Sequence, residues 1–156
     1  MPIISLDKKA PKFKLNNAYG KKIKLENYEG HWVVLFFYPK DNTTGCTQEA
    51  KNFSAASSQF KDLGATLMGI SPDSEKSHKK FIEDHGLEVE LLSDPEKKVL
   101  ERYGVWGIKK MYGREFMGVI RTTYLIDPNR RVRQVWEKVR IKKHVENVLE
   151  ALKSVQ

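Results

Sequence analysis

Apolar residues along the chain follow two kinds of pattern, continuous runs and helical spacings. The runs at residues 32–38 and 66–70 have the length and the content of Val, Ile, Leu and Phe that buried strands have. After the first run, Ala50, Phe53 and Phe60 recur at the spacing of one helix face. These patterns predict helices over 47–63, 75–85, 95–103 and 143–155, and strands over 32–38, 66–70, 91–94, 119–126 and 132–136.

Shorter segments complete this prediction. Residues 13–15 and 22–25 flank a turn-forming stretch and predict an N-terminal β-hairpin. Residues 104–118 carry glycines and aromatic side chains and are expected to be irregular. Strands that alternate with helices, followed by a hairpin and a last helix, predict an α/β fold with a mixed central β-sheet flanked by helices. The pattern alone leaves the strand order open.

The chain has 156 residues, a length that suits a single domain over 1–156 with one core. Its hydrophobic content of 40% and its charged content of 31% are typical of a soluble globular protein. No stretch approaches the roughly 18 apolar residues of a membrane span, so no membrane contact is expected. The first residues lack the apolar region of a signal peptide, so a cytoplasmic location is expected, with export by another route left open.

Cys46 is the only cysteine, and a turn-rich segment separates it from the predicted strand before it. A helix is predicted to begin at this thiol. The first turn of a helix has unpaired backbone N–H groups and a partial positive charge, and both favour a thiolate. A free cysteine is more often a small buried hydrophobic residue. Here Thr43, Gly45 and Thr47 are small or polar, unlike core residues, so the context indicates a reactive thiol.

Residues 38–50 read YPKDNTTGCTQEA and contain the spacing Pro39-x3-Thr43-x2-Cys46. This spacing resembles the signature of the peroxiredoxins, and the longer string is similar to their bacterioferritin comigratory protein, or peroxiredoxin Q, branch. Residues 103–128 are also similar to that branch, and the resemblance covers nearly the whole chain. It implies a thioredoxin-like fold and a thiol-dependent peroxidase. Such an enzyme reduces hydrogen peroxide and organic hydroperoxides in antioxidant defence, and no cofactor is expected.

Arg121 aligns with the active-site arginine of this family. A free cysteine has a pKa of about 8.5 and is mostly protonated at neutral pH. A helix N-terminus contributes only about 0.3–1 kcal/mol toward the thiolate, so a nearby cation or strong donors are needed. A guanidinium would also stabilise the charge that develops on the leaving oxygen. From the residues alone a surface ion pair is the simpler interpretation, because 28 lysines and arginines compete for the role.

Four neighbours of Cys46 are further candidates for the site, and the family pattern favours Thr43 among them as catalytic. Thr43 would donate its hydroxyl to the peroxide, or it would cap the helix. Pro39 would shape the loop and shield the thiolate, and the N–H groups of Gly45 and Cys46 would add donors to the peroxide site. Glu49 would orient the arginine through a bidentate pair, although an acid early in a helix is also a routine partner of the helix dipole.

The chain departs from its branch at Lys51, where many members carry a resolving cysteine. With no other cysteine, the sulfenic acid formed at Cys46 cannot be trapped in an internal disulfide. An external thiol must resolve it: thioredoxin, glutaredoxin, a small thiol or Cys46 of a second chain. We therefore expect a one-cysteine mechanism in a monomer or weak homodimer. A redox sensor or chaperone-like protein that uses the same thiol is the alternative.

The net charge is +8, and basic residues gather late in the chain. The cluster comprises Arg130, Arg131, Arg133, Lys138, Arg140, Lys142 and Lys143. Nucleic-acid binding is one interpretation, but no nucleic-acid-binding module accompanies the charge, so a solvated basic face is favoured. His31, His78, His85 and His144 show no metal-ligand spacing; we interpret them as surface or structural residues and expect no metal.

Overall fold

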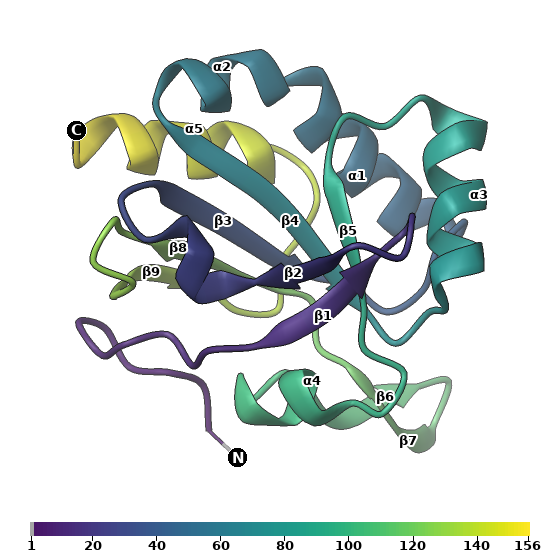
Figure 1. Cartoon of the computed structure of the whole chain (residues 1–156). Coiled ribbons are helices and arrows are strands. Elements are labelled where there is room, and N and C mark those ends of the chain that lie inside the picture. Colours follow the sequence, from purple (N-terminus) through teal and green to yellow (C-terminus); the bar gives the residue numbers. More distant parts are fainter. Residues whose placement is uncertain (1) are drawn as a thin grey trace.

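A computed structural model describes residues 2–156 and shows a central sheet packed on both faces (Figure 1). The helices are α1 (Thr44–Ala55), α2 (Ser57–Asp62), α3 (Glu75–His85), α4 (Lys98–Arg102) and α5 (His144–Ser154), with a 3-10 turn η1 (Leu25–Tyr28). The strands are β1 (Lys14–Asn17), β2 (Lys22–Lys24), β3 (Trp32–Phe37), β4 (Ala65–Ser71), β5 (Glu90–Ser93), β6 (Trp106–Met111), β7 (Arg114–Val119), β8 (Thr122–Ile126) and β9 (Val132–Trp136). The helices α1, α2, α3 and α5 cover one face of the sheet, and α4 lies on the other.

Seven strands form a mixed sheet in the order β2-β1-β5-β4-β3-β8-β9. The central strand β3 runs parallel to β4 and antiparallel to β8. Phe37, at the end of β3, pairs with Thr122, at the start of β8. The segment that leaves β3 and the segment that enters β8 therefore lie side by side, at the same end of these two strands. This register brings together the two parts of the candidate site.

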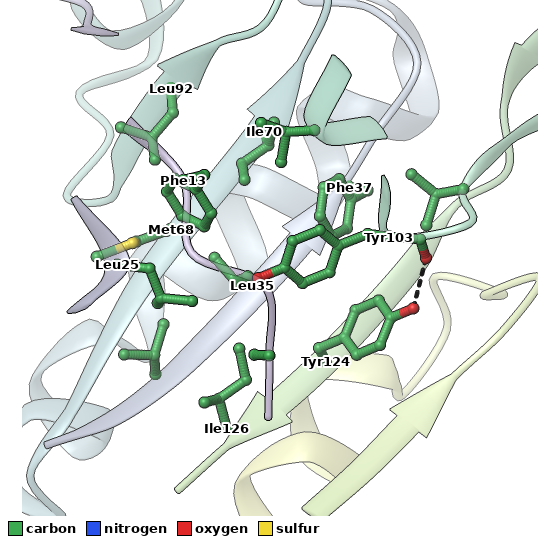
Figure 2. Close-up of a cluster of buried hydrophobic side chains, with 14 of the residues drawn as sticks. Phe13, Leu25, Leu35, Phe37, Met68, Ile70, Leu92, Tyr103, Tyr124 and Ile126 are labelled. Carbon is green, nitrogen blue, oxygen red and sulfur yellow. Dashed lines mark hydrogen bonds between the residues drawn. The ribbon is translucent and has the colours of Figure 1, made fainter. Parts of the chain in front are cut away.

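The central strand is buried on both faces, and its side chains alternate between two cores because successive residues of a strand point to opposite faces. Phe37 packs toward Tyr103 and Tyr124. The Tyr124 hydroxyl donates to the Tyr103 carbonyl at 2.6 Å (Figure 2). Phe36 points to the helix layer and stacks on Phe53 of α1, with ring centroids 4.6 Å apart. The two cores hold β3 and α1 in fixed relative positions.

The predicted mixed sheet with flanking helices and an N-terminal hairpin is confirmed. The predicted helix over 47–63 differs in its start and its continuity. α1 begins at Thr44, and the helical path is interrupted at Ala56 before α2 begins. Cys46 consequently lies inside the first turn of α1.

The prediction that residues 104–118 are irregular is wrong. They contain β6 and β7, which pair antiparallel as a hairpin separate from the seven-stranded sheet. Tyr112 and Gly113 connect the strands with φ values of 51° and 77°. Positive φ at both positions is what a two-residue type I′ hairpin turn requires.

Two further boundaries differ from the predicted ones. The strand expected over 119–126 is divided, because β7 ends at Val119 and β8 begins only at Thr122. The helix expected over 95–103 is shorter, since Lys97 has a φ of 64° and α4 begins after it. Among the helices of residues 2–156, none has both the length and the apolar content that crossing a membrane requires.

Candidate active site

Cys46 and Arg121 come into contact beyond the strand ends, where β3 ends and β8 begins. Cys46 lies in the first turn of α1, just after the loop that leaves β3, and is 2% exposed. Arg121 immediately precedes β8, and its Nη2 lies 3.2 Å from Cys46 Sγ. The sulfur thus faces a guanidinium and lies in the turn whose backbone N–H groups lack helical partners. A neighbouring cation and unpaired backbone N–H groups are the surroundings in which reactive cysteines occur in proteins.

Glu49 contacts the other side of the Arg121 guanidinium. It lies on α1 one turn after Cys46, and its Oε1 accepts a hydrogen bond from Arg121 Nη1 at 2.7 Å. The guanidinium therefore bridges Cys46 and Glu49 with its two terminal nitrogens, in place of the bidentate pair that we expected. Burial acts to lower the pKa of Arg121, but the charges of Glu49 and Cys46 outweigh it and raise the pKa.

The Glu49 carboxyl is shielded from water, with 1% of its side chain exposed. Burial raises its pKa to about 7, against the charge and the hydrogen bond of Arg121, which act to lower it. The second carboxyl oxygen, Oε2, has no hydrogen-bond partner among the residues that the structure describes. Glu49 therefore gains and loses a proton near neutral pH while in contact with Arg121.

His144 faces this second oxygen from the start of α5. Its Nε2 lies 3.9 Å from Glu49 Oε2 and 2.8 Å from Thr123 Oγ1. Burial, followed by the charge of Arg121, lowers the pKa of His144 to about 4, so the ring is neutral at pH 7. The contact between His144 and Glu49 is therefore not an ion pair. Sequence reasoning missed this neighbour of the site, because its partners lie on β8 and α1.

The loop between β3 and α1 carries Pro39 and Thr43. Thr43 occupies the N-cap position of α1 without a capping hydrogen bond from its side chain to any described residue. Its hydroxyl instead donates to the Lys40 carbonyl at 2.8 Å. Within residues 2–156 no group donates to Thr43 Oγ1, so in this arrangement it can accept a hydrogen bond from a peroxide O–H. This direction is the reverse of the predicted one.

Gly45 lies where the Arg121 guanidinium passes α1. A Cβ at this position would lie 3.3 Å from Arg121 Nη2 and 3.1 Å from Ile141 Cδ1. Both distances are tighter than ordinary van der Waals contact, so a side chain here would push against the guanidinium and Ile141. The glycine therefore allows Arg121 to approach Cys46.

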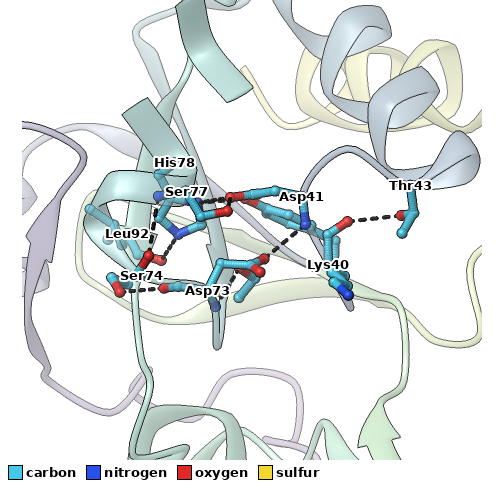
Figure 3. A network of polar contacts seen from close by, with 11 residues as sticks. Lys40, Asp41, Thr43, Asp73, Ser74, Ser77, His78 and Leu92 are labelled. Carbon is cyan, nitrogen blue, oxygen red and sulfur yellow. Dashed lines mark hydrogen bonds and ion pairs between the residues drawn. The ribbon is translucent and has the colours of Figure 1, made fainter. Parts of the chain in front are cut away.

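A buried polar network holds the loop from its other side (Figure 3). The Asp41 carboxylate accepts hydrogen bonds from the Tyr38 hydroxyl at 2.7 Å and the Ser77 hydroxyl at 2.8 Å. His78 Nδ1 lies 2.7 Å from Asp41 Oδ2, and His78 Nε2 lies 3.0 Å from the Leu92 carbonyl oxygen. One histidine of α3 thus connects the active-site loop to β5. Sequence reasoning did not identify this network.

Asp41, Asp73 and His78 place one possible metal-ligand atom each within 4.8 Å of one another. These atoms are already paired, however. Asp73 Oδ2 accepts from the Asp41 backbone N–H at 2.8 Å and from the Ser71 hydroxyl at 2.7 Å, and Asp41 contacts His78. We therefore interpret the cluster as a support of the loop.

Part of the late basic cluster is used in packing. Arg130 Nη1 donates to the Ala10 carbonyl at 2.8 Å, and Arg131 Nη1 donates to the Asp7 carbonyl at 2.7 Å. These bonds connect the turn between β8 and β9 to the N-terminal segment. Two arginines of the basic cluster therefore have a structural role in the chain itself, and nucleic-acid binding is not needed to explain them. The basic residues of segment 138–143 remain exposed.

Comparison with known proteins explains this arrangement of residues. The model of the AhpC/TSA family matches residues 6–135. The chain belongs to the AhpC/TSA family. Peroxiredoxin Bcp of Bacillus subtilis is 44% identical to this family member over 152 residues, which make up 97% of each chain. The putative peroxiredoxin bcp of Helicobacter pylori (strain J99) is 45% identical over 143 residues, covering 92% of this chain and 94% of the relative.

Solved structures agree with these relatives. A cysteine-to-serine mutant of peroxiredoxin Q from Xylella fastidiosa matches with a TM-score of 0.93 and 32% identity over 99% of both chains. The bacterioferritin comigratory protein of Xanthomonas campestris matches with a TM-score of 0.87 and 38% identity over 92% of this chain and 91% of that one. The predicted resemblance and the thioredoxin-like fold are thereby confirmed. This peroxiredoxin is a thiol peroxidase, an oxidoreductase.

Proposed function

We propose that this peroxiredoxin reduces hydrogen peroxide and organic hydroperoxides at Cys46 by a one-cysteine mechanism. The observation that carries the proposal is the 3.2 Å contact between Arg121 and the sulfur of the chain's only cysteine. The Xanthomonas campestris relative is described as having alkyl peroxide reduction activity. That description supports organic hydroperoxides as substrates here.

In the first step, the Cys46 thiolate attacks one peroxide oxygen, so that an S–O bond forms and the O–O bond breaks. Sulfur is oxidised to the sulfenic acid, and the other oxygen leaves as hydroxide or alkoxide and takes up a proton. Arg121 stabilises the thiolate and the charge that develops on the leaving oxygen. Thr43 accepts a hydrogen bond from the peroxide, the N–H of Gly45 donates one, and Pro39 shields the thiolate.

In the second step, a thiol from another molecule attacks the Cys46 sulfur, an S–S bond forms, and water leaves. A second thiol then attacks the mixed disulfide, which restores Cys46 and releases the reductant as a disulfide. The chain itself has no other cysteine for this step. The reductant is therefore external: thioredoxin, glutaredoxin or a small thiol.

Peroxide consumption with dithiothreitol as the thiol tests this function. Cys46 is the only cysteine, so alkylation with iodoacetamide, checked by intact mass, modifies one thiol and gives a control of otherwise identical sequence. We expect the untreated protein to consume many equivalents of hydrogen peroxide or cumene hydroperoxide, and the alkylated protein none above the uncatalysed rate. Equal rates in the two samples would refute the proposal.

Excess peroxide without thiol is expected to inactivate the enzyme irreversibly. No internal cysteine can capture the sulfenic acid of Cys46, so a second and a third peroxide oxidise it to the sulfinic and sulfonic acids. Mass spectrometry of the peptide that contains Cys46, together with activity after dithiothreitol is added back, measures this outcome. Full recovery of activity after high peroxide, with no sulfinic or sulfonic acid, would contradict the one-cysteine mechanism.

A further inference from the structure

The large apolar side chains that the structure exposes gather on the β6-β7 hairpin. Five of the seven in the described part of the chain lie there: Ile108 (63% exposed), Met111 (53%), Tyr112 (98%), Phe116 (44%) and Met117 (50%). The other two are Leu6 and Tyr19. Single exposed apolar residues are ordinary, but a group of them on one element is typical of an interaction site.

The hairpin exposes apolar side chains on both of its faces. Ile108 pairs directly with Met117, so these two side chains share one face. Lys109 pairs with Phe116, and this pair lies on the opposite face. The hairpin is not hydrogen bonded into the seven-stranded sheet, and an isolated two-stranded hairpin has little stability of its own. A partner that covered it would bury apolar area and also fix its conformation.

The base of the hairpin lies next to the thiol. Trp106 pairs with Val119, and the N–H of Ile120 donates to the Val105 carbonyl at 2.8 Å. The next residue along the chain is Arg121, which contacts Cys46. Lys109 of β6 is half-buried, and burial followed by the charge of Arg121 lowers its pKa, while the charge of Cys46 acts to raise it, so its ammonium group lies within electrostatic reach of both residues.

Positive charge surrounds the apolar residues and the site. Residues 106–119 contain three basic residues, Lys109, Lys110 and Arg114, and one acidic residue, Glu115, so the hairpin has a net charge of +2. Segment 138–143 is also joined to the site, because the Val139 N–H donates to the Arg121 carbonyl at 2.9 Å, and it exposes four basic residues: Lys138, Arg140, Lys142 and Lys143. A second copy of this surface would be repelled, whereas an acidic partner would be attracted.

We propose that the β6-β7 hairpin docks an acidic protein whose thiol reduces the sulfenic acid of Cys46. The proposal rests on the one-cysteine mechanism above and names the class of its reductant. Cys46 is 2% exposed, so a protein thiol reaches it only when the surrounding surfaces are in close contact. The apolar residues of the hairpin supply that contact, and its positive charge selects an acidic protein.

Steady-state reduction of the enzyme by a bacterial thioredoxin, an acidic dithiol protein kept reduced by its reductase and NADPH, tests this inference. The single variants Phe116→Ser, on the same hairpin face as Lys109, and Tyr112→Ser, at the turn, are each expected to lower kcat/KM for thioredoxin by about tenfold or more. Lys110→Glu/Arg114→Glu is expected to raise KM for thioredoxin and to weaken the salt dependence of the rate. With dithiothreitol, all three variants should turn over within about twofold of the wild type, which also shows that they fold.

Tyr19→Ser is the matched control, since Tyr19 is an exposed tyrosine outside the hairpin (61%), and we expect it to change neither rate. Unchanged thioredoxin kinetics in the hairpin variants would overturn the docking proposal. Wild-type turnover with dithiothreitol but none with thioredoxin would also overturn it, with the peroxidase function intact. A concentration-dependent dimer that the hairpin substitutions dissociate, without any change in reductant kinetics, would assign the surface to a second copy. Absence of turnover with dithiothreitol would instead contradict the proposed function.

Discussion

Replacing Arg121 by alanine is expected to lower kcat/KM for hydrogen peroxide by about 10²–10³-fold, the usual effect of removing one donor that stabilises developing negative charge. The guanidinium has two contacts in the site, at 3.2 Å to Cys46 Sγ and 2.7 Å to Glu49 Oε1. Its loss leaves the thiolate without its nearest cation and leaves the buried Glu49 carboxyl unpaired. Stopped-flow mixing of the reduced enzyme with peroxide measures the effect directly.

Three further variants make this result specific. Cys46→Ser should show no reaction and sets the lower limit of the assay. Arg121→Lys keeps the charge but has one ammonium group in place of two separated guanidinium nitrogens, so its rate should lie between those of the wild type and Arg121→Ala. Arg133→Ala removes an exposed arginine whose Nη1 lies 3.6 Å from Asp127 Oδ2, and should react within about twofold of the wild type. If Arg121→Ala matched Arg133→Ala, Arg121 would have no role in catalysis.

The thiol could be predicted from the sequence because its signal is local. An apolar run, a turn-rich loop and a helix surround Cys46 within a short stretch of chain, and each has its own pattern. Arg121 has no such signal and was identified only through the resemblance to the family. Its place beside Cys46 follows from the pairing of Phe37 with Thr122, which is a long-range property that residue spacing does not contain.

The hairpin was missed for a related physical reason. Period-two patterns arise when a core covers one face of a strand along its length, and in β6-β7 the core covers only the Trp106–Val119 pair at the base. Ile108 and Met117 are exposed on one face, and Phe116 on the other. The turn residues are Tyr112 and Gly113, in place of the Asn-Gly or Asp-Gly pair that signals this turn type. The absence of a strand pattern here reflects an uncovered surface.

Glu49→Gln is expected to change how stability depends on pH. The pKa of Glu49 rises from 4.5 to about 7 on folding, because the carboxyl is buried. Its favourable contribution to folding is complete below about pH 4.5 and is lost as pH rises through about 7. The shift corresponds to a decrease of about 3 kcal/mol in the free energy of unfolding as pH rises. Glutamine cannot ionise, so this decrease is absent in the variant.

His144 acts in the opposite direction over nearly the same range. Its pKa falls from 6.5 to about 4 on folding, so its favourable contribution is present above about pH 6.5 and is lost as pH falls through about 4. In the wild type the two contributions offset each other between about pH 4.5 and 6.5. In Glu49→Gln only the contribution of His144 remains, and the free energy of unfolding should rise with pH over this range relative to the wild type.

Urea denaturation at a series of pH values from about 4.5 to 7.5 measures this effect as the difference in free energy of unfolding between Glu49→Gln and the wild type. The variant also loses the contact with Arg121, which changes the free energy of unfolding by a constant amount. The ionisation of Glu49 is therefore measured by how the difference between variant and wild type changes with pH. We expect the difference to shift by about 3 kcal/mol in favour of the variant as pH rises. Glu146→Gln, which replaces an exposed acid of α5, is the matched control, and its difference from the wild type is measured over the same pH series. A difference for Glu49→Gln that follows this control at every pH would mean that Glu49 keeps an ordinary pKa, and that the contact with Arg121 is strong enough to overcome its burial.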